Sequence, residues 1–448
     1  MRVHVLGVCG TFMAGVALLA RELGHEVAGS DKGCYEPMAG QLRRAGVRWK
    51  APRGGQLPPA DLHIVGNAVS RGDPQLEAIL RRGLPHCSGP EWLQREVLAR
   101  RAKVVMVAGT HGKTTTSTML VHVLERLGWR PGYLVGGLPA GGLPSARLGG
   151  KKVAVVEADE YDTACWDKRP KFAHYRADVA VLTNVEFDHA DIYPDLAAVK
   201  RQFALLPRYL KPGGCLLRNA RDRHSRAAVA PAPWYELAAY SDPQGLAIAR
   251  KSLRDRRRGR DRRLPAAPPP GAHNRLNFLA AAAACERLGI PLAAAAAALA
   301  DYELPARRLQ RLAAAPCLLY DDFAHHPTAI AATLATLREL HPAQRITALL
   351  EPGSNTMRMG RWRTRLAPAL RAADRVRVYA AGLDWDVAAA LRPLGKRARI
   401  ETDAARLQAE LLRELRAGEV VVMLSNGSFG GLRETLPRAL ARIKKLPQ

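Results

Sequence analysis

The sequence predicts an α/β fold with three domains, each built on a mostly parallel sheet. Short apolar runs that are typical of buried strands alternate with segments whose apolar residues recur at helical spacing. The chain has 448 residues, which exceeds the size at which a single hydrophobic core keeps growing, so two to three domains are expected. A glycine-rich loop at residues 108–116 follows one apolar run and precedes a helical segment, as phosphate-binding loops do in α/β proteins.

A first domain is expected over residues 1–101. Its β-rich runs alternate with segments of helical spacing, at 3–8, 15–24, 25–30, 38–46 and 62–67. A charged helical segment at 91–103 then leads into the next apolar run.

A central domain is expected over residues 102–304. Apolar runs within 152–162 and 177–189 end in acidic and polar residues. Ligands of open α/β sheets bind outside the carboxyl ends of the strands, where these polar residues would lie. Alanine-rich segments at 279–289 and 292–304 are expected to be helices by propensity.

A third domain of the same α/β type is expected over residues 305–448. Four segments read as a strand followed by a loop, at 317–327, 345–354, 375–382 and 420–431.

The chain is strongly basic, with a net charge of +27 and a pI near 10.4. This charge would suit a polyanion such as nucleic acid. The arginines are spread along the whole chain, however, so a general drift of composition is the favoured interpretation and no nucleic-acid partner is expected. Residues 250–271 combine a charge run with prolines and are interpreted as a solvated surface excursion, with a nucleic-acid-binding arm as the alternative.

The seven cysteines are scattered, without a C-x-x-C pair. This spacing predicts reduced thiols, not a disulfide framework or a zinc site. No apolar run approaches the ~20 residues that span a bilayer, and the N-terminus lacks the features of a signal peptide. A cytoplasmic protein without a membrane partner is therefore expected.

The loop AGTHGKTTT carries the strongest chemical signal. Gly109 and Gly112 free the backbone so that successive N–H groups can face phosphate oxygens. Lys113 supplies a cation for the terminal phosphates, and Thr114 offers a hydroxyl to magnesium. A P-loop of the usual spacing would also have a glycine at the position of Val107.

Magnesium needs further oxygen ligands, preferably carboxylates at the end of a neighbouring strand. Glu157 in VVEADEYD and the acidic residues of NVEFDHAD are candidates, with a plain surface acidic turn as the alternative. His189, at the end of the second run, is read from the residues alone as a capping or core histidine.

Two further clusters and the N-terminal loop complete the candidates. Asn274 and Asn277 share one helix face in GAHNRLNFLAA, and YDDFAHHP places polar residues directly after a strand. The first loop, GVCGTFMAG, has Cys9 and Phe12 where a dinucleotide fingerprint needs glycines, so NAD binding is not expected.

The stretches GTHGKTTT, EADEYD, NVEFDHAD, HNRLN, RRLQ and DDFAHHP occur in this order. With them the chain resembles, over essentially its whole length, the Mur ligases, ATP-dependent enzymes that form amide bonds in peptidoglycan synthesis. The family's loop is similar to G-T-[HN]-G-K-[ST]-T, which removes the need for a glycine at Val107. The resemblance implies a Rossmann-like domain for the UDP-sugar, a central P-loop ATPase domain, and a Rossmann-like C-terminal domain that binds nucleotide and peptide. It also implies ATP and Mg²⁺, and a monomer or weak homodimer is expected.

Three stretches separate two activities within the family. GVCGTFM, EADEYD and EPGSNTMRMG are similar to members that join UDP-N-acetylmuramate to the murein tripeptide L-alanyl-γ-D-glutamyl-meso-diaminopimelate in peptidoglycan recycling. Members that attach L-alanine during de novo synthesis typically carry GIGGxGM, EADESD and a PHRYTRT-like loop. The tripeptide activity is expected, with L-alanine ligation as the alternative.

The resemblance also implies roles for individual residues. The catalytic set is Lys113, Glu157 and His189, and the magnesium ligands are Thr114, Glu157 and His189, which reverses the capping interpretation of His189. The implied ATP contacts are Gly109, Thr110, His111, Gly112, Lys113, Thr114, Thr115, Asn277, Arg308, Asp322 and His326. The implied UDP-sugar contacts are Gly10, Thr11, Phe12, Asp31, Asn67, Ala68 and Ser70. The implied peptide contacts are Ser354, Asn355, Thr356 and Arg358.

Two positions depart from the family pattern. Gly353 stands where an arginine is expected, so a contact to the peptide carboxylate is expected to be lost or supplied by Arg358 or Arg361. Several Mur ligases carry a carbamylated lysine where Phe203 and Ala204 stand here, so that modification is not expected.

Overall fold

The computed structural model describes residues 1–248, 251–257 and 261–443. These residues form two compact units. The first unit comprises Met1–Glu186, Ala197–Pro268 and Arg275–Glu303, and the second comprises Phe187–Leu196, Pro269–Asn274 and the described residues from Leu304. Within the described residues, no helix combines the length and the apolar character that crossing a membrane requires.

A five-stranded parallel sheet organises the N-terminal part of the first unit, in the order β3-β2-β1-β4-β5. The strands are β1 (Arg2–Leu6), β2 (Glu26–Ser30), β3 (Arg48–Lys50), β4 (Leu62–Val65) and β5 (His86–Ser88). The helices are α1 (Thr11–Glu22), α2 (Met38–Arg44), α3 (Pro74–Arg81) and α4 (Gly89–Glu96). Since all five strands are parallel, the loops after β1, β2 and β4 leave the same edge of the sheet.

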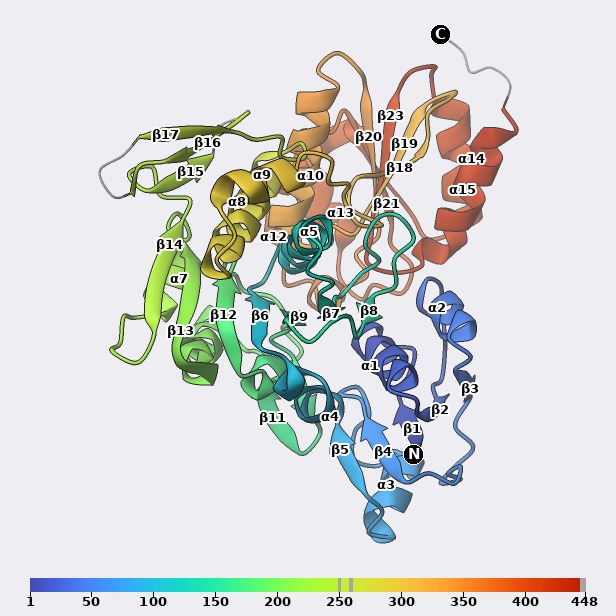
Figure 1. Ribbon diagram of the computed structural model, residues 1–448. Coiled ribbons are helices and arrows are strands. Elements are labelled where there is room, and N and C mark those ends of the chain that lie inside the picture. Colours follow the sequence, from blue (N-terminus) through green and yellow to red (C-terminus); the bar gives the residue numbers. More distant parts are fainter. Residues whose placement is uncertain (249–250, 258–260, 444–448) are drawn as a thin grey trace. The chain divides into compact units, whose positions relative to one another are not determined.

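A seven-stranded sheet follows in the same unit, in the order β14-β13-β12-β6-β9-β7-β8 (Figure 1). Only β8 runs antiparallel. The strands are β6 (Lys103–Ala108), β7 (Gly132–Leu134), β8 (Ala146–Arg147), β9 (Val153–Ala158), β12 (Ala177–Leu182), β13 (Leu210–Asn219) and β14 (Glu236–Tyr240). Helices α5 (Lys113–Arg126), α8 (Ala272–Arg287) and α9 (Leu292–Ala298) share one core with this sheet. The alanine-rich helices predicted from the sequence are thereby confirmed.

A hairpin connects β9 to β12. It consists of β10 (Asp162–Ala164) and β11 (Asp167–Pro170), and a short 3₁₀ helix, η2 (Lys171–His174), follows it. Helices α6 (Leu196–Ala204) and α7 (Arg223–Ala228) lie further along the chain.

The second unit contains a six-stranded sheet in the order β18-β19-β23-β20-β21-β22, with only β18 antiparallel. The strands are β18 (Gln310–Ala313), β19 (Leu318–Asp322), β20 (Ile346–Leu350), β21 (Arg375–Tyr379), β22 (Ala398–Glu401) and β23 (Val420–Leu424). The helices are α10 (Pro327–Leu340), α11 (Asn355–Arg358), α12 (Arg363–Ala369), α13 (Val387–Leu391), α14 (Ala404–Glu414) and α15 (Leu432–Ala441). Helices α10, α12 and α13 form one apolar core with the sheet, and α14 and α15 form another on the opposite face (Figure 1).

The α/β fold with three domains is confirmed, because each of the three large sheets falls inside one of the ranges expected from the sequence. The boundaries at residues 101 and 304 stay predictions. Two short segments, 187–196 and 269–274, group with the C-terminal unit although they interrupt the central range.

The interpretation of residues 250–271 as a solvated excursion is wrong for the part that the structure describes. Strands β16 (Ser252–Asp255) and β17 (Arg262–Pro265) pair with β15 (Leu246–Ile248) in an antiparallel sheet. Leu253 is buried in the core of the central domain, and arginines of the charge run pair with acidic neighbours, such as Arg254 with Asp261. Residue 250 and residues 258–260 of this segment lie outside the described residues.

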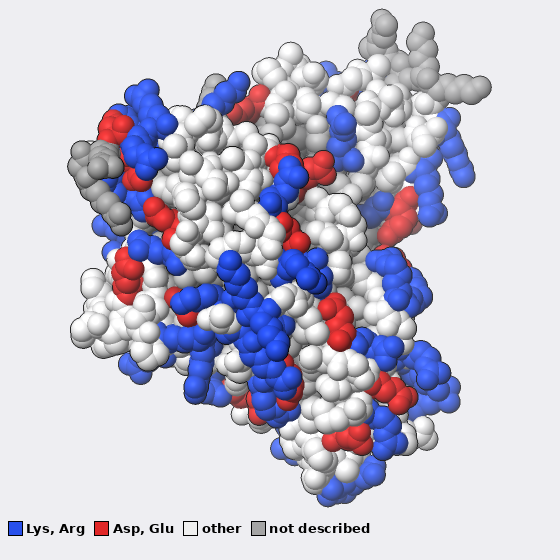
Figure 2. Space-filling model, viewed as in Figure 1, with Lys and Arg blue, Asp and Glu red and all other residues white. Residues whose placement is uncertain are grey.

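The basic side chains are not gathered on one element. Figure 2 shows lysine and arginine over most of the visible face, interspersed with acidic residues. Many of them form surface ion pairs such as Arg2 with Asp61 and Arg338 with Asp374. Such exposed pairs contribute little to stability.

Candidate active site

The phosphate loop, residues 109–112, connects the end of β6 to the start of α5. Gly109 and Gly112 have φ values of +122° and +83°, a region that side chains other than glycine rarely adopt. A Cβ atom at Gly109 would collide with Thr183, and one at Gly112 would collide with Asn277. Both positions therefore require glycine, whereas the backbone N–H groups of Thr110 and His111 between them donate to Asn184.

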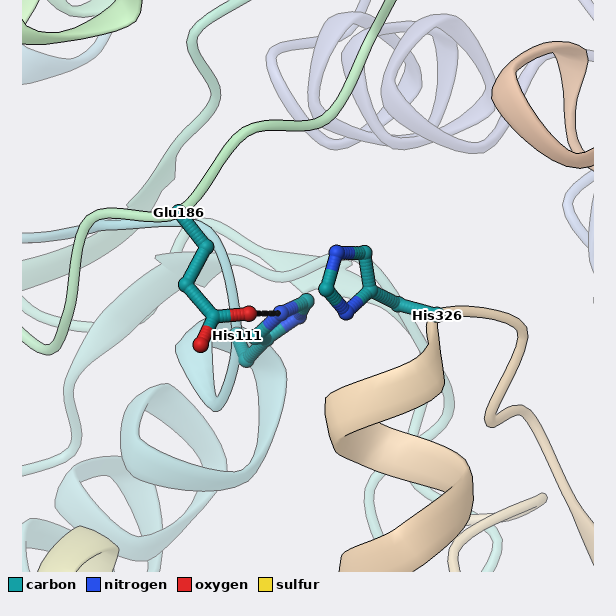
Figure 3. Close-up of side chains that lie close together, drawn as sticks. All are labelled: His111, Glu186 and His326. Atoms are coloured by element: carbon teal, nitrogen blue, oxygen red, sulfur yellow. Dashed lines mark hydrogen bonds and ion pairs between the residues drawn. The ribbon is translucent and has the colours of Figure 1, made fainter. Parts of the chain in front are cut away.

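The loop after β12 braces the phosphate loop. Asn184 accepts from the backbone N–H of His111 at 2.9 Å and donates to its carbonyl at 2.9 Å. The Thr183 hydroxyl donates to the same carbonyl at 2.7 Å. The Glu186 carboxylate lies 3.1 Å from Nε2 of His111 (Figure 3). Thr183 and Asn184 begin the stretch TNVEFDHAD, which the sequence marks as a candidate for magnesium ligands, but their contacts to the phosphate loop were not predicted.

Lys113 is held by the loop and by one carboxylate. Its Nζ donates to the carbonyl of Gly109 at 2.6 Å and to Oε2 of Glu160 at 2.8 Å. Burial alone would lower the pKa of Lys113, but the carboxylates of Glu160, Asp159 and Glu157 outweigh burial and raise it. The ammonium group is therefore charged and fixed beside the loop.

Glu157 and Thr114 form an oxygen donor pair. Glu157 Oε1 accepts from the Thr114 hydroxyl at 3.1 Å, and Oε2 accepts from the backbone N–H of Gly136 at 2.6 Å. Burial raises the pKa of Glu157, and the nearby Lys113 only partly offsets this effect. A buried carboxylate beside a hydroxyl is a donor set that fits a hard divalent cation such as Mg²⁺.

The acidic turn, residues 157–162, carries two ion pairs on adjacent residues. Glu160 is 1% exposed and holds Lys113, whereas the adjacent Asp159 holds Lys171 at 2.9 Å. Asp159 also accepts from the backbone N–H of Tyr161.

His189 lies in the second unit, on the segment 187–196. It has a positive φ of 57°, and its backbone N–H donates to the carboxylate of Asp188 at 2.8 Å. Asp188 also accepts from the Thr356 hydroxyl at 2.8 Å. Three histidines, His189, His325 and His326, lower the pKa of Asp188 although its burial raises it.

The expected peptide residues form α11 and its N-cap in the same unit. Ser354 caps this helix, and Asn355 donates to Asp191 at 2.8 Å. Arg358 donates to the carbonyl of Gly382 at 2.9 Å. A side chain at Gly353 would meet Asn426.

The expected nucleotide residues of the second unit follow β19. The buried Asp322 accepts from the backbone N–H groups of Leu309 and Ala324 at 2.7 and 2.9 Å. Burial raises the pKa of Asp322, with Arg308 acting in the opposite direction. His326 donates from Nε2 to the carbonyl of Phe187 at 3.2 Å and caps α10.

The expected UDP-sugar residues meet at one edge of the N-terminal sheet. Gly10 caps α1, and the Asp31 carboxylate accepts from the backbone N–H groups of Cys9 at 2.9 Å and Gly33 at 3.2 Å. Asn67, Ala68 and Ser70 follow β4 directly.

The prediction that all cysteines are reduced is wrong for two of them. Cys9 and Cys34 form a disulfide, with 5.2 Å between their Cα atoms. They are 25 residues apart, but the parallel pairing of β1 and β2 brings the loops that carry them together. The other five cysteines are free.

The fold and this site define a phosphate-loop nucleotide-binding enzyme of the α/β class. Three family models match consecutive parts of the chain: "Mur ligase family, catalytic domain" at residues 2–101, "Mur ligase middle domain" at 107–285, and "Mur ligase, glutamate ligase domain" at 307–427. The chain belongs to the Mur ligase family.

Several relatives match the whole chain. The UDP-N-acetylmuramate–L-alanyl-γ-D-glutamyl-meso-2,6-diaminoheptandioate ligase of Escherichia coli K12 is 42% identical, with 100% of both chains covered. The UDP-N-acetylmuramate–L-alanine ligase of Aromatoleum aromaticum is 30% identical over 99% of this chain and 98% of its own. Among solved structures, a murein peptide ligase from Psychrobacter arcticus is similar with a TM-score of 0.76, 34% identity and full coverage of both chains.

Proposed function

We propose that this protein is an ATP-dependent ligase that joins UDP-N-acetylmuramate to L-alanyl-γ-D-glutamyl-meso-diaminopimelate. The observation that carries the proposal is the 42% identity to a full-length relative named for this reaction. A second relative with that name, from Haemophilus influenzae, is 38% identical over 97% of this chain. Relatives named as L-alanine ligases reach 34% over 95% of this chain, as in Kineococcus radiotolerans.

The phosphate loop supports the ATP part of the proposal. Backbone N–H groups at the start of α5 would donate to the phosphate oxygens, and Lys113 would neutralise the terminal phosphates. Thr114 and Glu157, together with His189 of the second unit, would hold Mg²⁺. The ion would supply charge neutralisation and align the phosphates for in-line displacement.

A carboxylate does not react with an amine at a useful rate, because its oxygen is a poor leaving group. The carboxylate is therefore phosphorylated first. A carboxylate oxygen of the muramate lactyl group bonds to the γ-phosphorus of ATP, and the bond from that phosphorus to the ADP oxygen breaks. The amine of the peptide's L-alanine then attacks the acyl carbon. The C–N bond forms and the acyl C–O bond breaks, with its electron pair going to the departing phosphate. The amine loses a proton. Water must be excluded while the acyl phosphate exists.

Both units offer groups for the remaining contacts. Asp322, Arg308 and His326 are proposed to bind the nucleotide. Ser354, Asn355, Thr356 and Arg358 are proposed to bind the peptide. Gly10, Thr11, Phe12, Asp31, Asn67, Ala68 and Ser70 are proposed to bind the UDP-sugar.

ADP release tests the proposed function. With ATP, Mg²⁺ and UDP-N-acetylmuramate, we expect ADP to form together with a ligated product when the tripeptide is present. We expect kcat/KM to be at least about tenfold lower with free L-alanine, which lacks the binding contacts of the other two residues. A preference for L-alanine would instead support the alternative activity. ATP turnover that needs only DNA or RNA would overturn the proposal.

A further inference from the structure

Lys171 is a buried lysine that has no role in the proposed phosphoryl transfer or metal binding. It opens η2, its side chain is 6% exposed, and its backbone N–H donates to the carbonyl of Tyr161 at 3.1 Å. Among the described residues, its ammonium group makes one hydrogen bond, to Asp159 at 2.9 Å. An ammonium group has three N–H donors. Leaving buried donors unpaired is unfavourable.

The surroundings of Lys171 join two parts of the first unit. Its Nζ lies 5.2 Å from the ring centroid of Phe12 and 5.8 Å from that of Tyr161. Phe12 belongs to the loop that is proposed to bind the UDP-sugar. The preceding hairpin also reaches the N-terminal sheet, because Trp166 packs edge-to-face against His86 of β5.

Two consecutive carboxylates of the acidic turn each pair with one lysine. The consecutive carboxylates of Asp159 and Glu160 hold Lys171 and Lys113, at 2.9 and 2.8 Å. Consecutive Cα atoms are about 3.8 Å apart, so the turn keeps the two ammonium groups in one region. Lys113 faces the phosphate loop, whereas Lys171 faces the aromatic ring of the sugar loop.

We infer that Lys171 binds the carboxylate of the sugar-nucleotide substrate, an inference that rests on the proposed function. Phosphoryl transfer must bring an anionic carboxylate up to an anionic phosphate. Separate cations on the two sides reduce that repulsion and fix the reacting oxygens. Lys113 neutralises charge on the phosphate, and the remaining N–H donors of Lys171 donate to an oxygen of the substrate carboxylate. The Phe12 ring places this contact beside the sugar.

Binding of two sugar nucleotides tests the inference. UDP-N-acetylglucosamine shares the uridine and diphosphate of UDP-N-acetylmuramate but lacks its lactyl carboxylate. In Lys171→Met, we expect calorimetric Kd for UDP-N-acetylmuramate to rise about 10- to 100-fold, as for the loss of a hydrogen bond between charged groups. The Kd for UDP-N-acetylglucosamine should stay within about twofold because the lost contact is absent from that complex.

Two further variants separate recognition from structure. Lys171→Gln retains N–H donors toward Asp159 without the charge, and we expect it to show the same selective loss if Lys171→Met does not fold. Lys168→Met is the matched control, because Lys168 lies on the hairpin directly before Lys171, with a side chain 70% exposed and paired with Asp162. It should bind both nucleotides as the wild type does.

Unchanged binding of both nucleotides by Lys171→Met and Lys171→Gln would overturn the inference. An equal loss for both nucleotides would also overturn it, since that pattern indicates a contact to the diphosphate or a purely structural ion pair. Wild-type ligation assays run in parallel separate the two proposals. A wild type that fails to ligate UDP-N-acetylmuramate contradicts the proposed function, whereas normal ligation with unselective variants contradicts only the role of Lys171.

Discussion

Replacing Lys113 with methionine is expected to lower kcat for ligation by about 10²- to 10³-fold, the range seen when one group that stabilises developing charge is removed. Lys113 is the cation that the structure fixes beside the phosphate loop, through Gly109 and Glu160. Steady-state ADP release with saturating sugar nucleotide and tripeptide measures the effect. Lys151→Met, at an exposed position, is the control and should retain wild-type activity.

The Lys113→Met variant also needs a control for loss of stability. Glu160 is 1% exposed, and replacing Lys113 removes one ion pair from this buried carboxylate, which is destabilising. The double variant Lys113→Met/Glu160→Gln removes both charges and should restore thermal stability without restoring ligation. Recovery of ligation by the double variant would show that Lys113 acts only by compensating Glu160.

Glu157→Gln is expected to reduce ligation by about 10²-fold and to raise the Mg²⁺ concentration needed for half-maximal rate. Its carboxylate is buried, touches the Thr114 hydroxyl, and is the donor that the site offers to a hard cation. An amide keeps the size of the side chain but loses the charge that magnesium prefers. Titration of the rate with Mg²⁺, starting from EDTA-treated protein, measures both effects.

Glu36→Gln is the matched control for this experiment, because Glu36 is exposed and pairs with the exposed Arg43. It should leave the Mg²⁺ dependence unchanged. An unaltered Mg²⁺ dependence in Glu157→Gln would remove Glu157 from the proposed metal site.

The parts of the site that could be predicted from the sequence are those encoded locally. The order of β6, the phosphate loop and α5 follows from an apolar run, two glycines and a helical segment within about two dozen residues. The positive φ values of Gly109 and Gly112 agree with the reason for expecting glycine there. Glu157 was predicted because it ends a buried run, and β9 does pair with β6.

The parts that were missed depend on contacts between distant residues. Asn184 binds His111 across 73 positions, and Thr356 binds Asp188 across 168. No local periodicity encodes such pairs. The disulfide between Cys9 and Cys34 was missed for the same reason, since cysteine spacing does not show that β1 and β2 are neighbours.

The strands within residues 250–271 were missed because charge dominated the interpretation. Alternation along β16 buries Leu253 and leaves Arg254 on the other side, where it pairs with Asp261. Lys171 drew no attention in the sequence because a single lysine after a proline carries no motif. Its burial and its pairing with Asp159 appear only in the folded chain.

The proposed reaction transfers the γ-phosphoryl group of ATP to the sugar-borne carboxylate. UDP-N-acetylmuramate labelled with ¹⁸O in both carboxylate oxygens tests it most directly, with mass analysis of the phosphate released during ligation to the tripeptide. The acyl-phosphate route predicts that each phosphate carries one labelled oxygen from the carboxylate and that the amide retains the other. Unlabelled phosphate formed together with ligated product would contradict phosphoryl transfer to the carboxylate.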